Sequence, residues 1–409
     1  MQSYSPEQSL DTALAHIRAA AERLSPYVRR TPTVYSHTFS ETSGQEVFLK
    51  LENLQRTGSF KVRGALNKVL ALPKERLAKG LVAASAGNHA QGVALAAKLA
   101  GAHATIVMPV STPIIKVQRT ESYGAEVVLH GENYDAAQKR ATELCQERGS
   151  VLVHPFDDPW IVCGQGTVGL EMIDDLEDID AVVVPIGGGG LISGIALAIK
   201  ALSPKTRVIG VQAAGASPMV QSFLRGEKVR VANPTTIADG IRVGYVGDLT
   251  FDIVRKYVDE CVTVTESQIV DAVLQTIEKS KVVSETAGAA AIAAVLAGKV
   301  TKAHRVLALV CGGNIDLNLI ARIIESGLEQ SGRTHNLRLR VTDVPGQLAT
   351  ILAVLVANQC NVVDIQHYRA GFKVPLGMVD IDILVETRKS GAGELVDAAL
   401  RAKGYDLRS

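Results

Sequence analysis

The sequence has almost no net charge, few cysteines and few aromatic residues. Its 43 basic residues nearly balance its 42 acidic ones, and the formal net charge of +1 gives no field that favours nucleic acid or a membrane surface as a partner. The five cysteines form no CxxC pair and are odd in number, so neither a disulfide framework nor a zinc site is expected, and a reducing cytoplasm is favoured. This composition suits a small neutral or zwitterionic partner.

Targeting and membrane signals are also missing. The first residues are polar and lack the basic start and apolar stretch of a secretory signal. Residues 181–199 carry no charge, but Pro185 and a run of glycines would break a membrane-spanning helix. We expect this segment to form a strand, a loop and a helix.

The pattern that is present is that of an α/β protein. The 409 residues suffice for two or three domains, and from about residue 45 short apolar runs alternate with segments of helical period, as in βαβ units. The predicted strands are residues 47–51, 81–84, 104–109, 126–129, 151–154, 181–185, 207–211 and 305–310. The predicted helices include residues 62–72, 92–99, 134–148, 191–202 and 267–278. We therefore expect mainly parallel, buried sheets, with ligands beyond the carboxyl ends of the strands.

The chain changes character in its last quarter. Residues 326–335 are polar and predict a linker between a larger domain at residues 1–325 and a smaller one at residues 336–409. The smaller domain is predicted to be α+β. Its strands are expected at residues 336–341, 362–369 and 378–386, and its helices at residues 345–357 and 392–402.

Lys61 is the first residue whose position suggests chemistry. Ser59 suits an N-cap, which places Lys61 in the first turn of a helix, where the positive end of the helix dipole disfavours the ammonium form. The lowered pKa would supply the free amine that bonding to an aldehyde cofactor requires. The alternative is a surface lysine lying over its own helix, which is the usual case for a lysine.

A second candidate segment follows the strand at residues 81–84 and opens a helix. Its members are Ser85, Ala86, Gly87, Asn88 and His89. Their backbone N–H groups and the Ser85 hydroxyl are suited to bind a carboxylate. An ordinary strand-to-helix turn is the alternative.

A third segment follows the strand ending at Pro185 and opens another helix. It consists of Gly187, Gly188, Gly189, Gly190 and Leu191. Such a loop permits close approach of the backbone to a phosphate, although a flexible turn remains the alternative. A dinucleotide site is disfavoured, because the third glycine of GxGxxG would fall on Ile192 or Ser193. Cys311 follows the strand at residues 305–310, where a buried structural cysteine is the alternative.

Taken together, these segments resemble the serine/threonine dehydratase branch of the fold type II, or tryptophan-synthase-like, pyridoxal-phosphate enzymes. The matching segments are Ser59-Phe60-Lys61-Val62-Arg63-Gly64, Ser85-Ala86-Gly87-Asn88-His89-Ala90-Gln91-Gly92, Gly187-Gly188-Gly189-Gly190-Leu191, Ser284-Glu285-Thr286-Ala287-Gly288-Ala289-Ala290 and Cys311-Gly312-Gly313-Asn314. They agree in order and spacing over about residues 10–325. The resemblance implies a two-subdomain catalytic domain, with a small subdomain at about residues 50–155 inserted in a larger one.

The resemblance also assigns roles. Lys61 would bond through its amine to pyridoxal 5'-phosphate and later remove the α-proton of the substrate. Asn88 would bond the 3-hydroxyl of the cofactor, and the glycine loop with Leu191 would hold its phosphate. Ser85 and its loop, residues 85–89, would bind the substrate carboxylate. Phe60 would pack beside the cofactor ring, with simple core packing as the alternative.

Cys311 matches the family position that faces the pyridine nitrogen. A neutral partner cannot hold that nitrogen protonated, and the weaker electron withdrawal favours loss of a β-leaving group over transamination. The resemblance thus implies a threonine ammonia-lyase that makes 2-oxobutanoate and ammonia for isoleucine biosynthesis. Serine, giving pyruvate, is the expected side substrate.

Two departures from serine racemases bear on the reaction. Ala86 stands where those enzymes place a serine as acid on the opposite substrate face, which favours dehydration over racemisation. Gln212 matches the position of their metal-binding glutamate, so no metal is expected, with Asp239 and Glu285 as weak candidates for a cation site. The alternatives are a racemase-like enzyme, a β-replacement enzyme and a non-catalytic amino-acid sensor.

The C-terminal domain resembles an ACT domain. The segment that carries this resemblance is Val341-Thr342-Asp343-Val344-Pro345-Gly346-Gln347-Leu348. Gly346 permits close approach of a ligand, although a plain helix start is the alternative. The resemblance implies an allosteric amino-acid effector and a homodimer or homotetramer.

Overall fold

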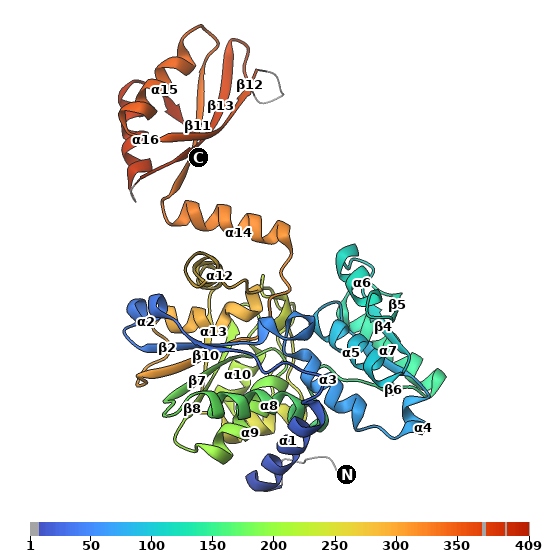
Figure 1. Cartoon of the computed structure of the whole chain (residues 1–409). Helices are drawn as coiled ribbons and strands as arrows, with labels where there is room; N and C mark the ends of the chain where they lie inside the picture. The colour runs from blue at the N-terminus through green and yellow to red at the C-terminus, as the bar shows by residue number, and fades with distance from the viewer. Residues whose placement is uncertain (1–7, 370–373, 389–390, 409) are drawn as a thin grey trace. The chain divides into compact units, whose positions relative to one another are not determined.

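The computed structural model in Figure 1 describes residues 8–369, 374–388 and 391–408. The chain forms two compact units, Met1–Ile315 and Asp316–Ser409. Among the described residues, none of the helices has the length and apolar character needed to cross a membrane.

The first unit contains a six-stranded sheet in which all neighbouring strands are parallel except the first pair. In spatial order its strands are β1 (Thr33–Tyr35), β2 (Glu46–Leu51), β10 (Arg305–Val310), β7 (Ala181–Pro185), β8 (Arg207–Ala213) and β9 (Glu260–Val264). Strands β7 and β10 are buried almost throughout, which explains their unbroken apolar sequence.

Helices cover both faces of this sheet (Figure 1). The helices of this part of the unit are α1 (Leu10–Leu24), α2 (His37–Ser43), α8 (Pro159–Asp175), α9 (Gly190–Leu202), α10 (Pro218–Arg225), α11 (Asp248–Tyr257), α12 (Glu266–Ser280) and α13 (Thr286–Leu296). Three short 3-10 turns, η1 (Glu52–Leu54), η2 (Arg56–Gly58) and η3 (Asp239–Ile241), complete this part. Asp158 caps α8 by accepting from the N–H groups of Trp160 and Ile161, and Pro159 suits the first helical position, where no N–H donor is needed.

A second sheet in the same unit has four parallel strands. In spatial order they are β5 (Glu126–Leu129), β4 (Ala104–Met108), β3 (Leu81–Ala84) and β6 (Val151–Leu152). The accompanying helices are α3 (Lys61–Leu70), α4 (Lys74–Leu77), α5 (Asn88–Ala100), α6 (Ile114–Glu121) and α7 (Tyr134–Arg148). Because β3, β7 and β10 each end directly before a predicted site segment, those segments all lie at carboxyl ends of strands.

A buried ion network anchors α3 to the larger sheet. Arg63 is 1% exposed and donates from Nε and Nη2 to the Glu52 carboxylate, at 2.9 and 2.7 Å, and from Nη1 to Glu171 at 2.7 Å. Lys50, which is fully buried, pairs with Glu171 and Asp175, each at 2.8 Å. The network therefore fixes the helix that begins at Lys61 against β2 and α8.

The second unit has βαββαβ topology, with a four-stranded antiparallel sheet. Its elements are α14 (Leu317–Gln330), β11 (Thr334–Thr342), α15 (Gln347–Ala357), β12 (Asn361–Tyr368), β13 (Met378–Glu386), α16 (Ala392–Ala402) and β14 (Asp406–Leu407). Residues of α15 and α16 share one core with alternating residues of β11 and β13. The segment predicted as a linker, residues 326–335, is mostly regular structure, because α14 continues to Gln330 and β11 begins at Thr334.

We expect Arg63→Leu to lower the free energy of unfolding by about 3–5 kcal/mol, because the fully buried carboxylate of Glu52 would lose its ion-pair partner and Glu171 would keep only Lys50. Urea denaturation of the purified protein measures the change. Arg230→Leu is the matched control, since the Arg230 side chain is 72% exposed and its ion pair spans 3.5 Å. Equal destabilisation by the two substitutions would show that the buried network does not stabilise the fold.

Candidate active site

Lys61 is held at the end of β10 by backbone contacts. The structure corrects the predicted cap, because Phe60 rather than Ser59 occupies the N-cap position of α3, and it makes no side-chain cap bond. Ser59 instead forms an isolated antiparallel bridge with Gly312, and the Phe60 N–H donates to the Cys311 carbonyl at 3.2 Å. The lysine is thereby placed next to the end of a central strand.

The amine of Lys61 is partly buried and donates a hydrogen bond to the Pro155 carbonyl at 2.9 Å. Burial lowers the pKa of Lys61 to about 8, while the nearby Cys311 and Glu285 act in the opposite direction. The direction agrees with the sequence-based expectation. The main physical cause is desolvation of the ammonium group.

The glycine loop packs against the protein at distances that no side chain would allow. A Cβ atom on Gly188 would lie 2.3 Å from the Phe156 ring, and one on Gly190 would lie 2.8 Å from the Phe156 carbonyl oxygen. Gly189 is the N-cap of α9 and has φ of 100°, a conformation that glycine adopts readily. Glycine is therefore required here both for space and for conformation.

Two side chains hold the carbonyl groups of this loop. Thr250 Oγ1 donates to the Gly188 carbonyl at 2.8 Å, and Gln212 Nε2 donates to the Gly187 carbonyl at 3.2 Å. The first N–H groups of a helix have no partner within the helix. With the carbonyls bound by the protein, the N–H groups at the start of α9 form a site suited to a phosphate.

The segment Pro155–Phe156 brings the lysine and the loop together. The Pro155 carbonyl accepts from the Lys61 amine, and the next residue, Phe156, packs on Gly188 and Gly190. An amine of lowered pKa and an anion-binding loop thus share one wall of the site.

Asn88 is the first residue of α5 and its side-chain amide is bonded on both sides. Asn88 Nδ2 donates to Glu285 Oε1 at 2.7 Å, and Asn88 Oδ1 accepts from Asn314 Nδ2 at 2.8 Å. In the preceding loop, the Ser85 hydroxyl accepts from the Gly87 N–H at 3.2 Å. This contact shapes the loop predicted to bind a carboxylate.

Ala86 and His89 complete that loop. Ala86 packs against the core of the smaller sheet. His89 is buried and its Nε2 bonds the Val153 carbonyl at 2.8 Å, while burial and the charge of Lys61 lower the pKa of His89 to about 3. The ring is therefore a neutral donor that supports the loop.

Phe60, Leu191 and Cys311 belong to the core cluster of the larger sheet. The Cys311 thiol donates a weak hydrogen bond to the Ala287 carbonyl at 3.7 Å. Burial raises the pKa of Cys311 above its usual range, so the thiol remains neutral.

The two weak cation-site candidates are bonded to other residues. Asp239 forms an ion pair with Lys116 at 2.6 Å, and Glu285 accepts from Asn88. Burial, with a smaller contribution from Asp239, raises the pKa of Glu285 to about 7. Within residues 8–369, 374–388 and 391–408, no group of three or more His, Cys, Asp or Glu side chains is arranged to hold a metal.

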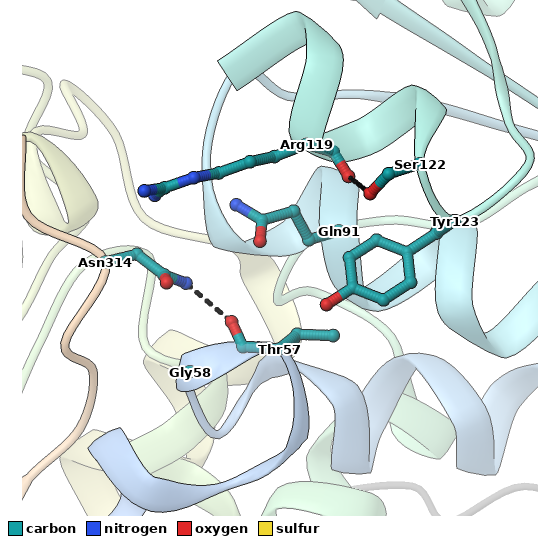
Figure 2. Close-up of a pocket in the computed structure, with 7 residues that line it drawn as sticks. All are labelled: Thr57, Gly58, Gln91, Arg119, Ser122, Tyr123 and Asn314. Carbon is teal, nitrogen blue, oxygen red and sulfur yellow. Dashed lines mark hydrogen bonds between the residues drawn. The ribbon is translucent and has the colours of Figure 1, made fainter. Parts of the chain in front are cut away.

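A cavity of about 320 Å³ lies beside this network (Figure 2). It is lined by Thr57, Gly58, Gln91, Arg119, Ser122, Tyr123 and Asn314. Asn314 is thus both part of the cavity wall and a partner of Asn88.

Sequence reasoning missed several of these positioning contacts. The sequence marks Gln212 only as a position without a metal-binding carboxylate, yet it supports the glycine loop. Asn314 is the last residue of the segment Cys311-Gly312-Gly313-Asn314, which the sequence pattern identified, so this segment was a signal for its positioning role. Thr250 and Phe156 lie in segments without a recognisable pattern, and only the folded chain brings them to the loop.

Comparison with known proteins identifies the family. The family model described as "Pyridoxal-phosphate dependent enzyme" matches residues 24–312. The chain belongs to this family.

Its relatives agree along most of the chain. An L-threonine ammonia-lyase of Thermotoga maritima is 47% identical over 97% of this chain and 98% of its own length. A catabolic L-threonine dehydratase of Staphylococcus aureus is 46% identical over 77% of this chain and 93% of its own.

Solved structures of the family share the fold. A processed threonine deaminase from Solanum lycopersicum is 37% identical, with a TM-score of 0.75 over 80% of this chain and 96% of its own. Maize serine racemase is 38% identical, with a TM-score of 0.73 over 78% of this chain and 98% of its own. The predicted α/β fold with mainly parallel sheets is confirmed.

The pyridoxal-phosphate family's cofactor fits the residues of this site. The glycine loop at the start of α9 suits its phosphate, and the Lys61 amine suits its aldehyde. The buried hydroxyls of Ser59 and Ser284 have no hydrogen-bond partner among the described residues, so polar atoms remain available beside Lys61 and Glu285.

We expect cofactor-free protein to regain the visible absorbance of bound pyridoxal phosphate at a rate that rises with pH through about 8. The reason is that the Lys61 amine must lose its proton before it can bond to the aldehyde, and burial lowers its pKa to about 8. Stopped-flow absorbance measures the rate. Pyridoxine 5'-phosphate, which lacks the aldehyde, should bind without this pH step, and a midpoint near that of an ordinary lysine would contradict the prediction.

We expect Thr250→Val to raise the Kd for pyridoxal phosphate by about five- to tenfold, since the Gly188 carbonyl would lose a hydrogen bond worth about 1 kcal/mol. Fluorescence titration of the cofactor-free protein measures this. Thr276→Val is the matched control, because Thr276 is also buried and its hydroxyl donates to a backbone carbonyl within α12. An equal Kd in the two variants would rule out a role for Thr250 in holding the loop.

Proposed function

We propose that this protein is a threonine ammonia-lyase, which removes water and then ammonia from L-threonine and gives 2-oxobutanoate. L-serine, giving pyruvate, is the proposed side substrate. The observation that carries the proposal is the joint placement of the Lys61 amine and the glycine loop on Pro155–Phe156. The similarity to an L-threonine ammonia-lyase over 97% of the chain supports the choice of substrate.

Bound pyridoxal phosphate withdraws electrons from the α-carbon of an amino acid. Lys61 Nζ is the base that takes the α-proton, and its pKa of about 8 leaves an appreciable fraction unprotonated near neutral pH. The backbone of residues 85–89, shaped by the Ser85 hydroxyl, holds the substrate carboxylate at the start of α5. Asn88 would bond the ring hydroxyl of the cofactor. Phe60 and Cys311 line the site on the side of the hydrophobic core.

Cys311 supports elimination as the reaction. Its thiol is neutral and buried, so it does not supply the charge that would keep the ring nitrogen of the cofactor protonated. Weaker electron withdrawal shortens the life of the negative charge at the α-carbon and favours departure of the β-hydroxyl group. Transamination is correspondingly disfavoured.

Ala86 distinguishes this proposal from racemisation. Racemisation needs an acid that returns a proton to the face opposite Lys61, and the methyl group of Ala86 cannot donate one. Formation of D-serine from L-serine at a rate comparable to pyruvate release would favour a racemase.

A β-replacement enzyme and a non-catalytic sensor would make different demands on the site. A β-replacement enzyme would need a second substrate, so threonine alone would give no keto acid while a thiol acceptor would restore turnover. A non-catalytic sensor would bind an amino acid without holding the cofactor. The lowered pKa of Lys61 and the supported glycine loop favour a threonine ammonia-lyase over both.

We further propose that residues 336–409 form an ACT regulatory domain that binds an amino-acid effector. The βαββαβ topology supports this, as does Gly346, which has φ of 94° at the start of α15 with open space around its Cβ position. An unchanged rate of keto-acid release with isoleucine or valine added would argue against it.

The cellular setting is part of the same proposal. The five cysteines are free, which suits a reducing cytoplasm, and 2-oxobutanoate production suits isoleucine biosynthesis. We propose a homodimer or homotetramer, which sedimentation of the purified protein would test.

We expect Lys61→Ala to abolish both the visible absorbance of the bound cofactor and the release of 2-oxobutanoate from L-threonine, because the base and the point of attachment are lost together. A coupled keto-acid assay and an absorbance spectrum measure the two effects. Lys98→Ala, an exposed position on α5, is the matched control and should behave like the unaltered protein. Full activity of Lys61→Ala would refute the proposed function.

A further inference from the structure

Contacts within the protein determine the orientation of the Asn88 side-chain amide. The inference drawn from this orientation rests on the proposed function, in which Asn88 bonds the cofactor. A side-chain amide can point its oxygen and nitrogen in either sense, and the surrounding donors and acceptors decide between them. Here the deciding group is a backbone carbonyl, which can only accept. It belongs to Thr57, four residues before Lys61.

Asn314 transmits this constraint to Asn88. Asn314 Nδ2 donates to the Thr57 carbonyl at 2.6 Å, as Figure 2 shows, and also to Asn88 Oδ1 at 2.8 Å. Because the Thr57 carbonyl requires a donor, Nδ2 of Asn314 must face it. The Asn88 amide must then turn its oxygen towards Asn314 and its nitrogen away from it.

Glu285 requires the same orientation from the other side. The residue is 4% exposed, and its Oε1 accepts from Asn88 Nδ2 at 2.7 Å. Its own backbone N–H donates to the Gly312 carbonyl at 3.0 Å. A reversed Asn88 amide would place an N–H against the Asn314 N–H, which is repulsive. It would also place an oxygen against the Glu285 carboxyl, which is repulsive when that carboxyl is ionised.

The surrounding glycines leave space for this network. A Cβ on Gly312 would lie 2.3 Å from Glu285 Oε1, and a Cβ on Gly58 would lie 2.5 Å from Asn314 Oδ1. Thr57 adopts φ of 64°, which is unfavourable for a β-branched residue, and its carbonyl is one of the groups that Asn314 binds. The turn before Lys61 and the amide of Asn88 are therefore held by one side chain.

We propose that Asn314 and Glu285 are positioning residues that lock the Asn88 amide. One N–H of Asn88 Nδ2 is used by Glu285, and the second is left to donate to the ring hydroxyl of pyridoxal phosphate. Asn314 in addition couples this donor to the turn that carries Lys61. The Lys61 amine, proposed to meet the cofactor aldehyde, and the Asn88 amide, proposed to meet its hydroxyl, are thereby held at a fixed distance and orientation.

A double-mutant cycle tests the proposal. Asn314→Ala, Asn88→Ala and the double variant are each titrated with pyridoxal phosphate, and the absorbance of the bound cofactor is recorded against pH. We expect each single variant to raise the Kd by about tenfold and to move the absorbance transition in the same direction. The double variant should bind clearly less than tenfold more weakly than Asn88→Ala, since Asn314 acts mainly through Asn88 and only the remainder comes from the Thr57 turn.

Conservative and control variants separate positioning from general support of the fold. Glu285→Gln keeps an acceptor for Asn88 and should stay within about threefold of the unaltered Kd, whereas Glu285→Ala should resemble Asn314→Ala. Asn53→Ala is the matched control, because Asn53 Nδ2 also donates to a nearby backbone carbonyl, that of Val283. If Asn314→Ala does not fold, Asn314→Asp removes the N–H donor while keeping the side-chain volume.

Additive effects in the double variant, or an unchanged absorbance transition in Asn314→Ala and Asn314→Asp, would overturn the proposal. Either result would show that Asn314 supports only the Thr57 turn. Failure of the proposed function would look different, because the unaltered protein would then bind the cofactor with the expected variant pattern but release no keto acid from threonine.

Discussion

The site depends on keeping the Lys61 amine partly out of water. Desolvation disfavours the ammonium form and makes the amine available for reaction, but it also removes hydration that the group would otherwise have. The Pro155 carbonyl replaces part of that hydration. The helix that carries the lysine is in turn fixed by Arg63, whose guanidinium is bonded to the carboxylates of Glu52 in η1 and Glu171 in α8. The reactivity of Lys61 thus depends on the ion pairs of Arg63, which lies half a turn further along α3.

Close backbone approach is the second constraint. The space that a side chain would need is filled at Gly188 by the Phe156 ring, and at Gly312 by the Glu285 carboxyl. A Cβ on Gly92 of α5 would lie 3.2 Å from the Lys61 carbonyl. Each of these glycines places a functional group nearer to its neighbour than an alanine would permit. The glycine content at the site therefore serves packing as much as ligand binding.

The strands that position the site can be predicted from the sequence, but the side-chain contacts between them cannot. Residues 81–84, 181–185 and 306–310 are apolar runs followed by turn signals, and β3, β7 and β10 have these bounds, with Arg305 as the first residue of β10. The three-residue β1 is too short to show a pattern, so no strand is predicted there. Residues 326–330, predicted as part of a linker, form the end of α14, and the sequence did not indicate this because α14 buries only Ile323 and Gly327 and its last turn is polar. The Thr250 contact with the glycine loop joins residues far apart in sequence, and no local pattern predicts it.

The distribution of proton-transfer groups gives a further argument about the reaction. Among the described residues discussed for the loops at strands β3, β7 and β10, His89 is neutral and bonded to a backbone carbonyl, and Cys311 is a buried neutral thiol. Ala86 offers only a methyl group. Lys61 has a pKa of about 8 and its nitrogen lies at the wall of the site, whereas Glu285, whose pKa is about 7, is bonded to Asn88. Under the proposed function, a single base acting from one face removes an α-proton without returning it to the other face, which favours departure of the β-substituent over inversion at the α-carbon.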